Sequence, residues 1–395
     1  QLFDVIVIGA GVMGSSAAYH SGKRGLKTLL LEQFDFLHQR GSSHGESRTT
    51  RVTYPEHYYP KMVLESTRLW EEAERDAGFK VYYRTAHLDL GPSESKYLAA
   101  VVESCRENAI PVRVLDADQV SAEFRGVFRL PEGWIGVVND HGGVIKPTKA
   151  VAMLQSLCLR YGASLRDNER VVGIERDGST DEIVVSTADG GGFRSRKCVI
   201  TAGAWTGNLI EKARGITLPI QPLETTVFYW KIRHGFESDF AIENGFPTFA
   251  SFGDTYVYGT PSLEYPGLIK IPAHSGRPCA PEERTWTAQE SPPLSPLQTW
   301  IETLFGGKID AESSVAKQSC IYSMTPDEDF FLDFLGGDFG KNAVVCGGFS
   351  GHGFKMAPIV GRIAADLAQR GETEGVELEH FTIDRFRNNP KGNPK

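Results

Sequence analysis

Three glycines near the amino terminus have the spacing with which a protein backbone wraps a pyrophosphate. Gly9, Gly11 and Gly14 follow the apolar run 3–8, which predicts a buried strand. Gly9 permits a tight turn, Gly11 lets the backbone approach a phosphate, and Gly14 allows the next helix to pack on the strand. Glu32, 18 residues after Gly14, can accept hydrogen bonds from both ribose hydroxyls. The alternative is three turn glycines and a surface acid, which the register of strand, helix and acid disfavours. The pattern predicts a dinucleotide cofactor and leaves FAD and NAD both open.

A second run of glycines lies near the carboxyl terminus. Small residues fill much of the stretch 347–353, and Lys355 follows directly. So many glycines are expected where the backbone is pressed against a bound molecule. Lys355 is therefore predicted to face a ligand.

The elements that position these residues can be read from the apolar pattern. After the strand at 3–8, residues 12–23 predict a helix and residues 28–31 a second strand, which together make one dinucleotide-binding unit. Short apolar runs of the same kind recur at 198–201 and 343–346. We therefore expect a parallel sheet that is completed by segments from distant parts of the chain.

Other stretches have a different character and indicate a second domain. Alternating patterns at 225–230 and 255–258 predict strands of an antiparallel sheet. A helix is predicted over 147–159, with Pro147 in its first turn. The length of 395 residues also favours two domains.

Composition excludes several classes of function. A net charge of -8 argues against nucleic acid as a partner, because phosphate binding needs a basic surface. The six cysteines form no C-x-x-C pair, so no metal site and no disulfide framework is predicted, and a reducing compartment fits best. No apolar run is long enough for a membrane span, and the first one breaks at Gly9 without a signal-cleavage pattern.

Three segments, in this order along the chain, carry a family resemblance. They are 40–51 (RGSSHGESRTTR), 320–328 (CIYSMTPDE) and 348–355 (GFSGHGFK). Together they resemble the monomeric sarcosine oxidase and peroxisomal sarcosine and L-pipecolate oxidase family of FAD-dependent amine oxidases. The resemblance extends from the first strand to the last helix.

The resemblance implies an α/β fold in two parts. A Rossmann-like FAD-binding domain would be assembled from residues 1-88, 149-220 and 321-395. A catalytic domain with an antiparallel sheet (α+β) would comprise residues 89-148 and 221-320. This division agrees with the distant strand segments described above.

The resemblance also implies roles for individual residues. It implies a covalent 8α-S-cysteinyl link from the flavin to Cys320. The expected cofactor-binding set is Gly9, Gly11, Gly14, Glu32, Ser42, Ser43, Cys320, Gly348, Gly351 and Gly353. The expected catalytic set is His44 and Arg48 at the flavin ring, Lys270 as the oxygen-activating lysine, and Tyr258, His274 and Tyr322 as pocket residues. Arg51 and Lys355 would hold a substrate carboxylate.

These roles fit the chemistry, although simpler readings of the same residues exist. A buried carboxylate needs a compensating charge, which Arg51 supplies unless it is only a surface arginine. Lys270 would stabilise the superoxide that forms when oxygen takes an electron, unless it is a sheet-edge lysine. Cys320 read alone is a small buried hydrophobe.

Several cations together would lower the pKa of a bound amine, so no dedicated general base is needed. Replacement of His44 or His274 by Asn should therefore reduce turnover only modestly.

We therefore expect oxidation of a small secondary amino acid, such as sarcosine or L-pipecolate, to the imine, with reduction of O2 to hydrogen peroxide. The alternatives are an oxidase of larger N-alkyl or cyclic amino acids, an NAD-dependent amino acid dehydrogenase, and a non-catalytic flavoprotein. The expected protein is a monomer without nucleic acid, membrane or metal partners. Its expected location is peroxisomal in a eukaryote and otherwise cytoplasmic, and it is not expected to be secreted.

Overall fold

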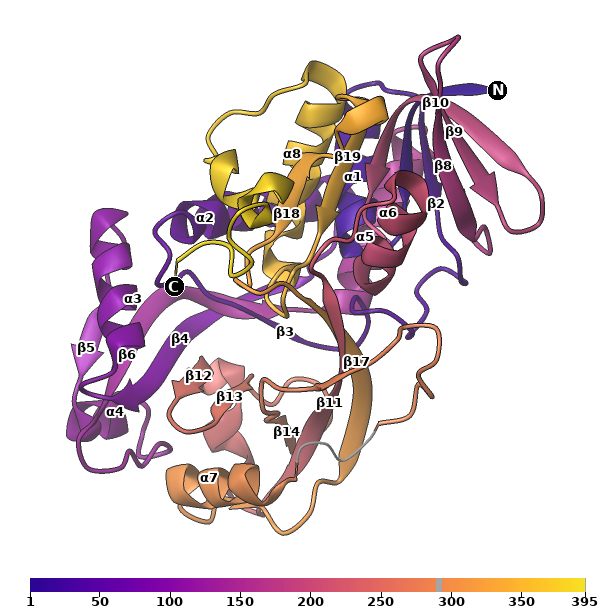
Figure 1. Ribbon diagram of the computed structural model, residues 1–395. Helices are drawn as coiled ribbons and strands as arrows, with labels where there is room; N and C mark the ends of the chain where they lie inside the picture. The colour runs from indigo at the N-terminus through magenta and orange to yellow at the C-terminus, as the bar shows by residue number, and fades with distance from the viewer. Residues whose placement is uncertain (289–292, 395) are drawn as a thin grey trace.

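A large sheet forms the upper half of the molecule (Figure 1). The computed structural model describes residues 1–288 and 293–394. The strands of this sheet, in spatial order, are β18 (Phe331–Phe334), β19 (Ala343–Gly347), β10 (Gly192–Ile200), β1 (Leu2–Ile8), β2 (Thr28–Leu31) and β7 (Ser164–Arg166). All neighbours from β19 to β7 pair in parallel, and β18 pairs antiparallel with β19. β8 (Val171–Asp177) and β9 (Glu182–Thr187) extend the sheet from β10.

The sheet confirms the expectation of a parallel core built from distant parts of the chain. β1 and β2 come from the amino-terminal part, β7 to β10 from the middle and β18 and β19 from the carboxyl-terminal part. The β-branched run of β1 is almost wholly buried, because helices cover one face of the sheet and further apolar residues cover the other.

Helix α1 (Val12–Lys23) has the predicted bounds and packs between the sheet and two other helices. It contacts α5 (Pro147–Arg160), which begins at the predicted proline, and α8 (Ala357–Arg370). Its small residues permit this close packing. A Cβ added to Gly14 would lie 1.8 Å from the carbonyl oxygen of Gly9, so only glycine fits there.

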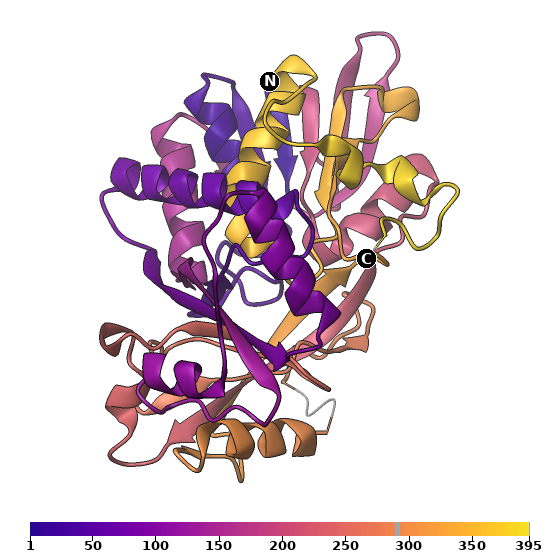
Figure 2. The ribbon, with the colours of Figure 1, turned by 90° about the vertical axis from the view of Figure 1, so that its left-hand side faces the viewer.

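Two smaller sheets lie below the large one in Figures 1 and 2. The first contains β13 (Tyr256–Gly259), β12 (Thr248–Phe252), β4 (Tyr82–Pro92), β6 (Trp134–Ile145), β3 (Arg48–Thr50) and β5 (Arg113–Leu115). The second contains β14 (Leu268–Lys270), β11 (Gln221–Ile232), β15 (Arg277–Pro278), β16 (Ile309–Asp310) and β17 (Ala316–Met324). All pairs given for them are antiparallel, as expected, except β12 with β4, which is parallel.

The remaining helices cover the edges of these layers. They are α2 (Tyr59–Ala77), α3 (Lys96–Glu107), α4 (Ala117–Glu123), α6 (Thr206–Arg214) and α7 (Ser295–Phe305). Short 3-10 turns include η5 (Phe354–Met356), η6 (Leu378–Phe381) and η7 (Ile383–Phe386). Within the described ranges, no helix has the length and apolar character that crossing a bilayer requires.

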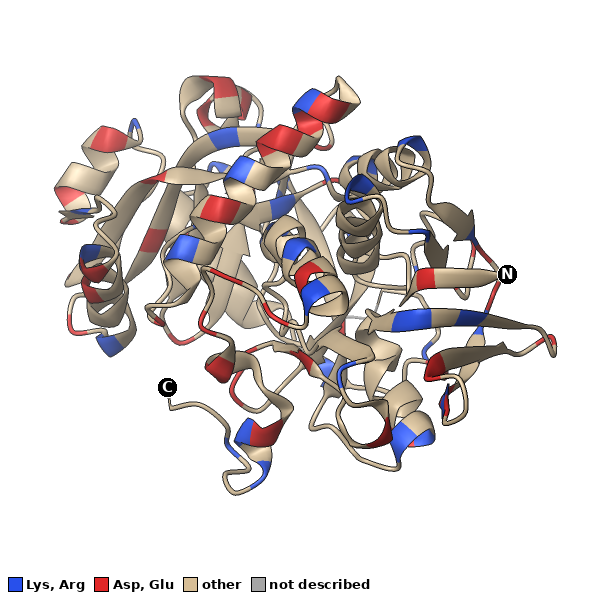
Figure 3. Cartoon of the chain, turned by 90° about the horizontal axis from the view of Figure 1, so that it is seen from above, with Lys and Arg blue, Asp and Glu red and all other residues tan. Residues whose placement is uncertain are grey.

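Three apolar cores hold the layers together. Two lie on opposite faces of the large sheet, and the third, rich in phenylalanine, fills the space between the smaller sheets and α7. The surface seen from above carries acidic and basic residues interspersed along the exposed helices (Figure 3). Strands β4 and β17 cross the expected domain borders at 88/89 and 320/321, so the chain passes between the layers within continuous strands.

Candidate active site

The amino-terminal glycines form one end of a long groove. Gly9 has a φ of +96°, and a Cβ there would lie 2.6 Å from the carbonyl oxygen of Thr201. Gly11 begins α1, and the next amide donates a 3.0 Å hydrogen bond to the Ser43 hydroxyl. Glu32 is buried at the end of β2, where one carboxylate oxygen accepts a 2.9 Å hydrogen bond from the Ala10 amide. The helix start and the acid therefore lie side by side, as the fingerprint requires.

The groove continues toward the end of β17. Its lining joins the glycine loop and Glu32 to a second group of residues, which comprises Ser42, Ser43, His44, Arg48, Cys320, Tyr322, Phe349, Gly351, Gly353 and Phe354. Two of the expected cofactor-binding glycines, Gly14 and Gly348, are not part of this lining. A Cβ on Gly348 would meet Thr325 and Phe331. Gly14 packs inside the strand–helix turn.

Cys320 is buried in β17 beside two basic side chains. Arg48 places Nη2 3.8 Å from the Cys320 sulfur. Burial opposes ionisation of this thiol, but the nearby His44 imidazole and the positive charge of Arg48 outweigh it and lower the pKa of Cys320 to about 6. At neutral pH the side chain is therefore mostly a thiolate. This environment is unlike that of an inert core cysteine such as Cys198, where burial alone raises the pKa to about 12.

Arg48 also fixes the loop that carries His44. Its guanidinium donates to the carbonyl oxygens of Ser47 at 2.7 Å, Ser42 at 3.1 Å and His44 at 2.8 Å. The His44 Nδ1 lies 3.2 Å from the side-chain amide nitrogen, Nε2, of Gln318, a residue of β17. The loop is thus held against the strand that bears Cys320. Gln318 gives no signal in the sequence, because only the pairing of β17 with β11 brings it here.

Lys270 lies on the outermost strand of its sheet, yet its side chain is buried. β14 pairs with β11, and Lys270 is 3% exposed. Its ammonium donates to the carbonyl oxygen of Ser47 at 2.9 Å and to the Ser47 hydroxyl at 3.0 Å. The Ser47 hydroxyl bonds in turn to Glu264, which also accepts from the Tyr229 hydroxyl. A buried lysine cannot protect an exposed sheet edge, which excludes the simpler reading of Lys270.

Burial also narrows the pH range over which Lys270 is charged. Desolvation lowers its pKa to about 8, and Arg48 contributes in the same direction, while Glu264 acts in the opposite sense. The lysine is therefore a cation at neutral pH that loses its proton at moderately alkaline pH.

Arg51 and Lys355 approach each other across the ring of Tyr54. The Arg51 guanidinium lies 4.4 Å above the centre of this ring, and the Lys355 ammonium donates a 2.8 Å hydrogen bond to its hydroxyl. Both cations are buried, and Arg51 is only 7% exposed, so it is not a surface arginine. Burial and the charge of Arg51 lower the pKa of Lys355.

Neither of these cations has a carboxylate partner among the described residues. Arg51 donates to the Tyr97 hydroxyl at 3.2 Å, and its Nη1 has no hydrogen-bond partner within residues 1–288 and 293–394. A buried guanidinium beside a buried lysine, with no carboxylate in ion-pair contact among the described residues, forms an environment that favours an anion. Tyr54 and Tyr97 were missed by sequence reasoning, since a tyrosine in a loop or at a helix start carries no spacing signal.

His352 orients the lysine of this pair. Its Nε2 donates to the carbonyl oxygen of Glu328 at 2.9 Å, and its Nδ1 accepts from the Tyr54 hydroxyl at 3.1 Å. The carbonyl oxygen of His352 accepts from the Lys355 ammonium at 2.9 Å. His352 is therefore a positioning residue in the loop that precedes Lys355.

An aromatic wall connects the cation pair to the groove. The hydroxyls of Tyr258 and Tyr322 lie 3.3 Å apart, and the His274 ring lies 5.0 Å from the Tyr322 ring. A Cβ on Gly351 would come within 2.7 Å of His274, so this loop presses directly against the wall. Burial, assisted by Arg51 and Lys355, lowers the pKa of His274 to about 4. His274 is therefore neutral at physiological pH.

The similarity of this chain to known proteins extends over most of its length. The family model described as "FAD dependent oxidoreductase" matches residues 4–367, which is most of the chain. The chain belongs to this family. The FAD-dependent oxidoreductase has the mixed α/β fold expected from the sequence, in which a nucleotide-binding sheet is joined to a second group of sheets.

Two relatives match over nearly the whole length of the oxidoreductase. It is 57% identical over 396 residues to the probable sarcosine oxidase of Arabidopsis thaliana, covering 100% of this chain and 95% of that one. It is 36% identical to the human peroxisomal sarcosine oxidase, covering 98% and 97%. The same fold occurs in the solved structure of NikD, an unusual amino acid oxidase essential for nikkomycin biosynthesis, with a TM-score of 0.83, 24% identity and 97% of both chains covered.

The residues of the oxidoreductase fit FAD along the groove. The glycine turn at the start of α1 is shaped for a pyrophosphate, and Glu32 lies where a ribose would reach it. At the other end, Cys320, Arg48 and His44 surround the space that remains for a ring system. The recognition of the family and of FAD from the sequence is confirmed.

Proposed function

We propose that this enzyme oxidises a small secondary amino acid, such as sarcosine or L-pipecolate, to the imine and passes the electrons to O2, forming hydrogen peroxide. One observation carries the proposal: Arg51 and Lys355 are buried, close together and without a carboxylate partner among the described residues. A substrate carboxylate would complete the charge balance. The names of the Arabidopsis and human relatives support the same class of substrate.

The residues around the bound amine would control its protonation. FAD supplies the acceptor for the two electrons that leave the substrate. The amine must be unprotonated to release them, and nearby Arg51, Lys355 and Lys270 would each disfavour an ammonium ion. His274, with its pKa of about 4, would not compete for the proton as a strong base. The pocket as a whole therefore replaces a dedicated general base.

Lys270 is proposed as the residue that activates oxygen. A fixed cation stabilises the negative charge that oxygen acquires with its first electron. Ser47 holds the Lys270 ammonium in place, and the negative charge of Glu264 opposes the lowering of its pKa. Loss of this cation should slow reoxidation of the cofactor without equal loss of its reduction.

Cys320 is proposed as the site of a covalent 8α-S-cysteinyl flavin link. A thiolate is the reactive form for such a bond, and its pKa of about 6 makes the thiolate abundant at neutral pH. Arg48 and His44 create this state. They are proposed to contact the flavin ring as well.

The remaining proposals concern organisation. We propose that residues 1-88, 149-220 and 321-395 bind FAD and that 89-148 and 221-320 form the catalytic part. Residue 395 lies outside the described residues, as do 289–292. A monomer is proposed, and a peroxisomal location is supported by the name of the human relative.

A panel assay tests this function. Purified enzyme is supplied with sarcosine, L-pipecolate, L-proline and N-methylated aromatic amino acids, and hydrogen peroxide is measured with and without oxygen. Peroxide from the small substrates supports the proposal, whereas activity confined to the aromatic ones favours the oxidase of larger N-alkyl amino acids. Oxidation that requires NAD would overturn it in favour of a dehydrogenase, and no oxidation of any amine would favour a non-catalytic flavoprotein.

A further inference from the structure

Three potential metal ligands meet at the surface, and they are His57, Glu377 and His380. His57 lies just before α2, whereas Glu377 and His380 lie in the carboxyl-terminal segment at η6. The Nε2 atoms of both histidines lie 3.5 Å from the same carboxylate oxygen of Glu377. One ligand atom from each of the three residues lies within 4.8 Å of the other two.

This arrangement matches the chemistry of a zinc-class ion. Imidazole nitrogens and a carboxylate oxygen bind Zn²⁺ at about 2.0–2.2 Å, which puts neighbouring ligand atoms of a tetrahedral site about 3.3 Å apart. The two distances of 3.5 Å from Glu377 to the histidines are close to this value, and the two histidine nitrogens lie within 4.8 Å of each other, so the three side chains would move inward to bind an ion. Water would fill the remaining position, because the three residues leave one side open to solvent.

Neighbouring residues hold the His380 ring and the backbone of His57 in place. The His380 ring is stacked on Tyr58, with ring centres 4.0 Å apart and planes inclined by 16°. The carbonyl oxygen of His57 accepts a 2.9 Å hydrogen bond from the side chain of Asn108, the residue that follows α3. Such supporting contacts reduce the entropy lost when a metal is bound.

We propose that His57, Glu377 and His380 form a binding site for one zinc-class divalent ion, which fastens the carboxyl-terminal segment to the start of α2. Sequence spacing does not predict this site, because its ligands are far apart along the chain and come together only when the carboxyl-terminal segment folds back. The proposal does not depend on the proposed substrate or on FAD.

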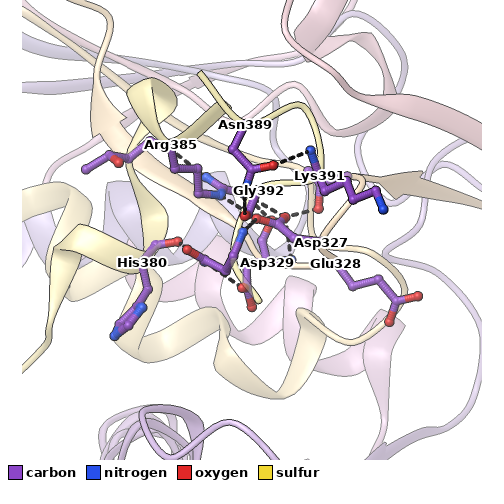
Figure 4. A network of polar contacts seen from close by, with 12 residues as sticks. Asp327, Glu328, Asp329, His380, Arg385, Asn389, Lys391 and Gly392 are labelled. Carbon is purple, nitrogen blue, oxygen red and sulfur yellow. Dashed lines mark hydrogen bonds and ion pairs between the residues drawn. The ribbon is translucent and has the colours of Figure 1, made fainter. Parts of the chain in front are cut away.

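The same segment is fastened elsewhere by a buried polar network (Figure 4). Arg385 pairs with Asp327 at 2.7 Å, and Asn393 donates to Asp329 at 2.7 Å and to the carbonyl oxygen of His380 at 2.9 Å. The imidazole of His380 points away from this network. A metal bound by His57, Glu377 and His380 would therefore attach the carboxyl-terminal segment at a second place, separate from this network.

The attachment lies close to the positioning residues of the candidate active site. The hydroxyls of Tyr58 and Tyr59 both donate to Asp329, at 2.8 Å. The Tyr59 ring also packs 5.3 Å from that of His352, which orients Lys355. Metal binding would thus stabilise the folded arrangement around α2 by mass action, without contributing a group to the reaction.

Zinc titration by calorimetry tests the proposal. Untagged, FAD-loaded enzyme is freed of metal with a chelator and titrated with zinc chloride, with magnesium chloride as the hard-cation comparison. We expect one zinc per chain and no magnesium binding. His57→Gln and His380→Gln should each weaken zinc binding by more than about 10-fold. Loss of a residue that only supports a metal ligand already costs about 10-fold, so loss of a ligand should cost more.

His234→Gln is the matched control, because His234 is a fully exposed histidine that also faces a glutamate, Glu237. It should leave the titration unchanged. Zinc should raise the melting temperature of the wild type and of His234→Gln, but not of His57→Gln. Absence of zinc binding to the wild type, or equal binding by all three variants, would overturn the proposal. An unchanged flavin spectrum would show that each variant is folded.

Discussion

Lys270 provides a quantitative prediction about the pH dependence of cofactor reoxidation. Its pKa of about 8 follows from burial, with Glu264 opposing and Arg48 assisting the shift. A lysine is cationic below its pKa, so roughly 90% of the side chain is charged at pH 7 and roughly 10% at pH 9. If the cation stabilises the reduced oxygen, the rate constant for reoxidation should fall about tenfold between these two values.

The assay separates the two halves of the reaction. Enzyme reduced without oxygen by its substrate is mixed with oxygenated buffer at a series of pH values, and recovery of the oxidised flavin absorbance is followed. Lys270→Met should be slow at every pH, while Lys270→Arg should show no fall, because arginine stays protonated throughout. Glu264→Gln should move the fall to lower pH, since the carboxylate that raises the lysine pKa is lost.

A reoxidation rate in the wild type that does not change between pH 7 and pH 9 would refute this reasoning. Equal slowing of flavin reduction and reoxidation in Lys270→Met would remove the oxygen-activating role itself. If Lys270→Met behaves as expected and Glu264→Gln leaves the profile unmoved, only the charge effect of Glu264 on Lys270 is wrong.

Three further predictions concern the other site residues. Cys320→Ser should release the yellow colour into the supernatant after acid precipitation, whereas the wild type should keep it with the protein; equal release from both would refute the covalent link. Arg51→Met should lower kcat/KM by roughly 30- to 5,000-fold, the equivalent of about 2–5 kcal/mol for one partner of a buried charge pair, and steady-state kinetics would contradict the carboxylate role if the change were below that range. His274→Asn and His44→Asn should retain most turnover, and a loss on the order of 10²- to 10⁴-fold would reveal a general base.

Local sequence determined the nucleotide-binding part of the fold almost completely. The bounds predicted for α1 and β2 agree with the structure, and α5 begins at Pro147. Apolar periodicity and the glycine turn act within about 30 residues, so no tertiary information was needed there. The parallel pairing of β12 with β4 was not foreseen, because strand partners far apart in sequence leave no periodic signal.

The candidate site could likewise be predicted only in part from the sequence. The glycines and Glu32 were identified from spacing, and Lys270, Arg51 and Cys320 through family resemblance. Their burial could not be read from the sequence, since Lys270 on an outer strand becomes enclosed only when the loop carrying Ser47 folds over it. The contacts of Tyr54, Gln318 and Glu264 likewise arise from the packing of separate segments.

The central claim is that Arg51 and Lys355, which have no carboxylate partner among the described residues, bind the carboxylate of an amino acid beside the flavin. Anaerobic reduction of the flavin by two matched pairs tests it most directly: L-pipecolate against piperidine, and sarcosine against dimethylamine. Each pair shares the secondary amine and differs by the carboxylate. The account predicts that at least one amino acid bleaches the flavin rapidly while its partner without a carboxylate does not, and equally rapid bleaching by both members would contradict it.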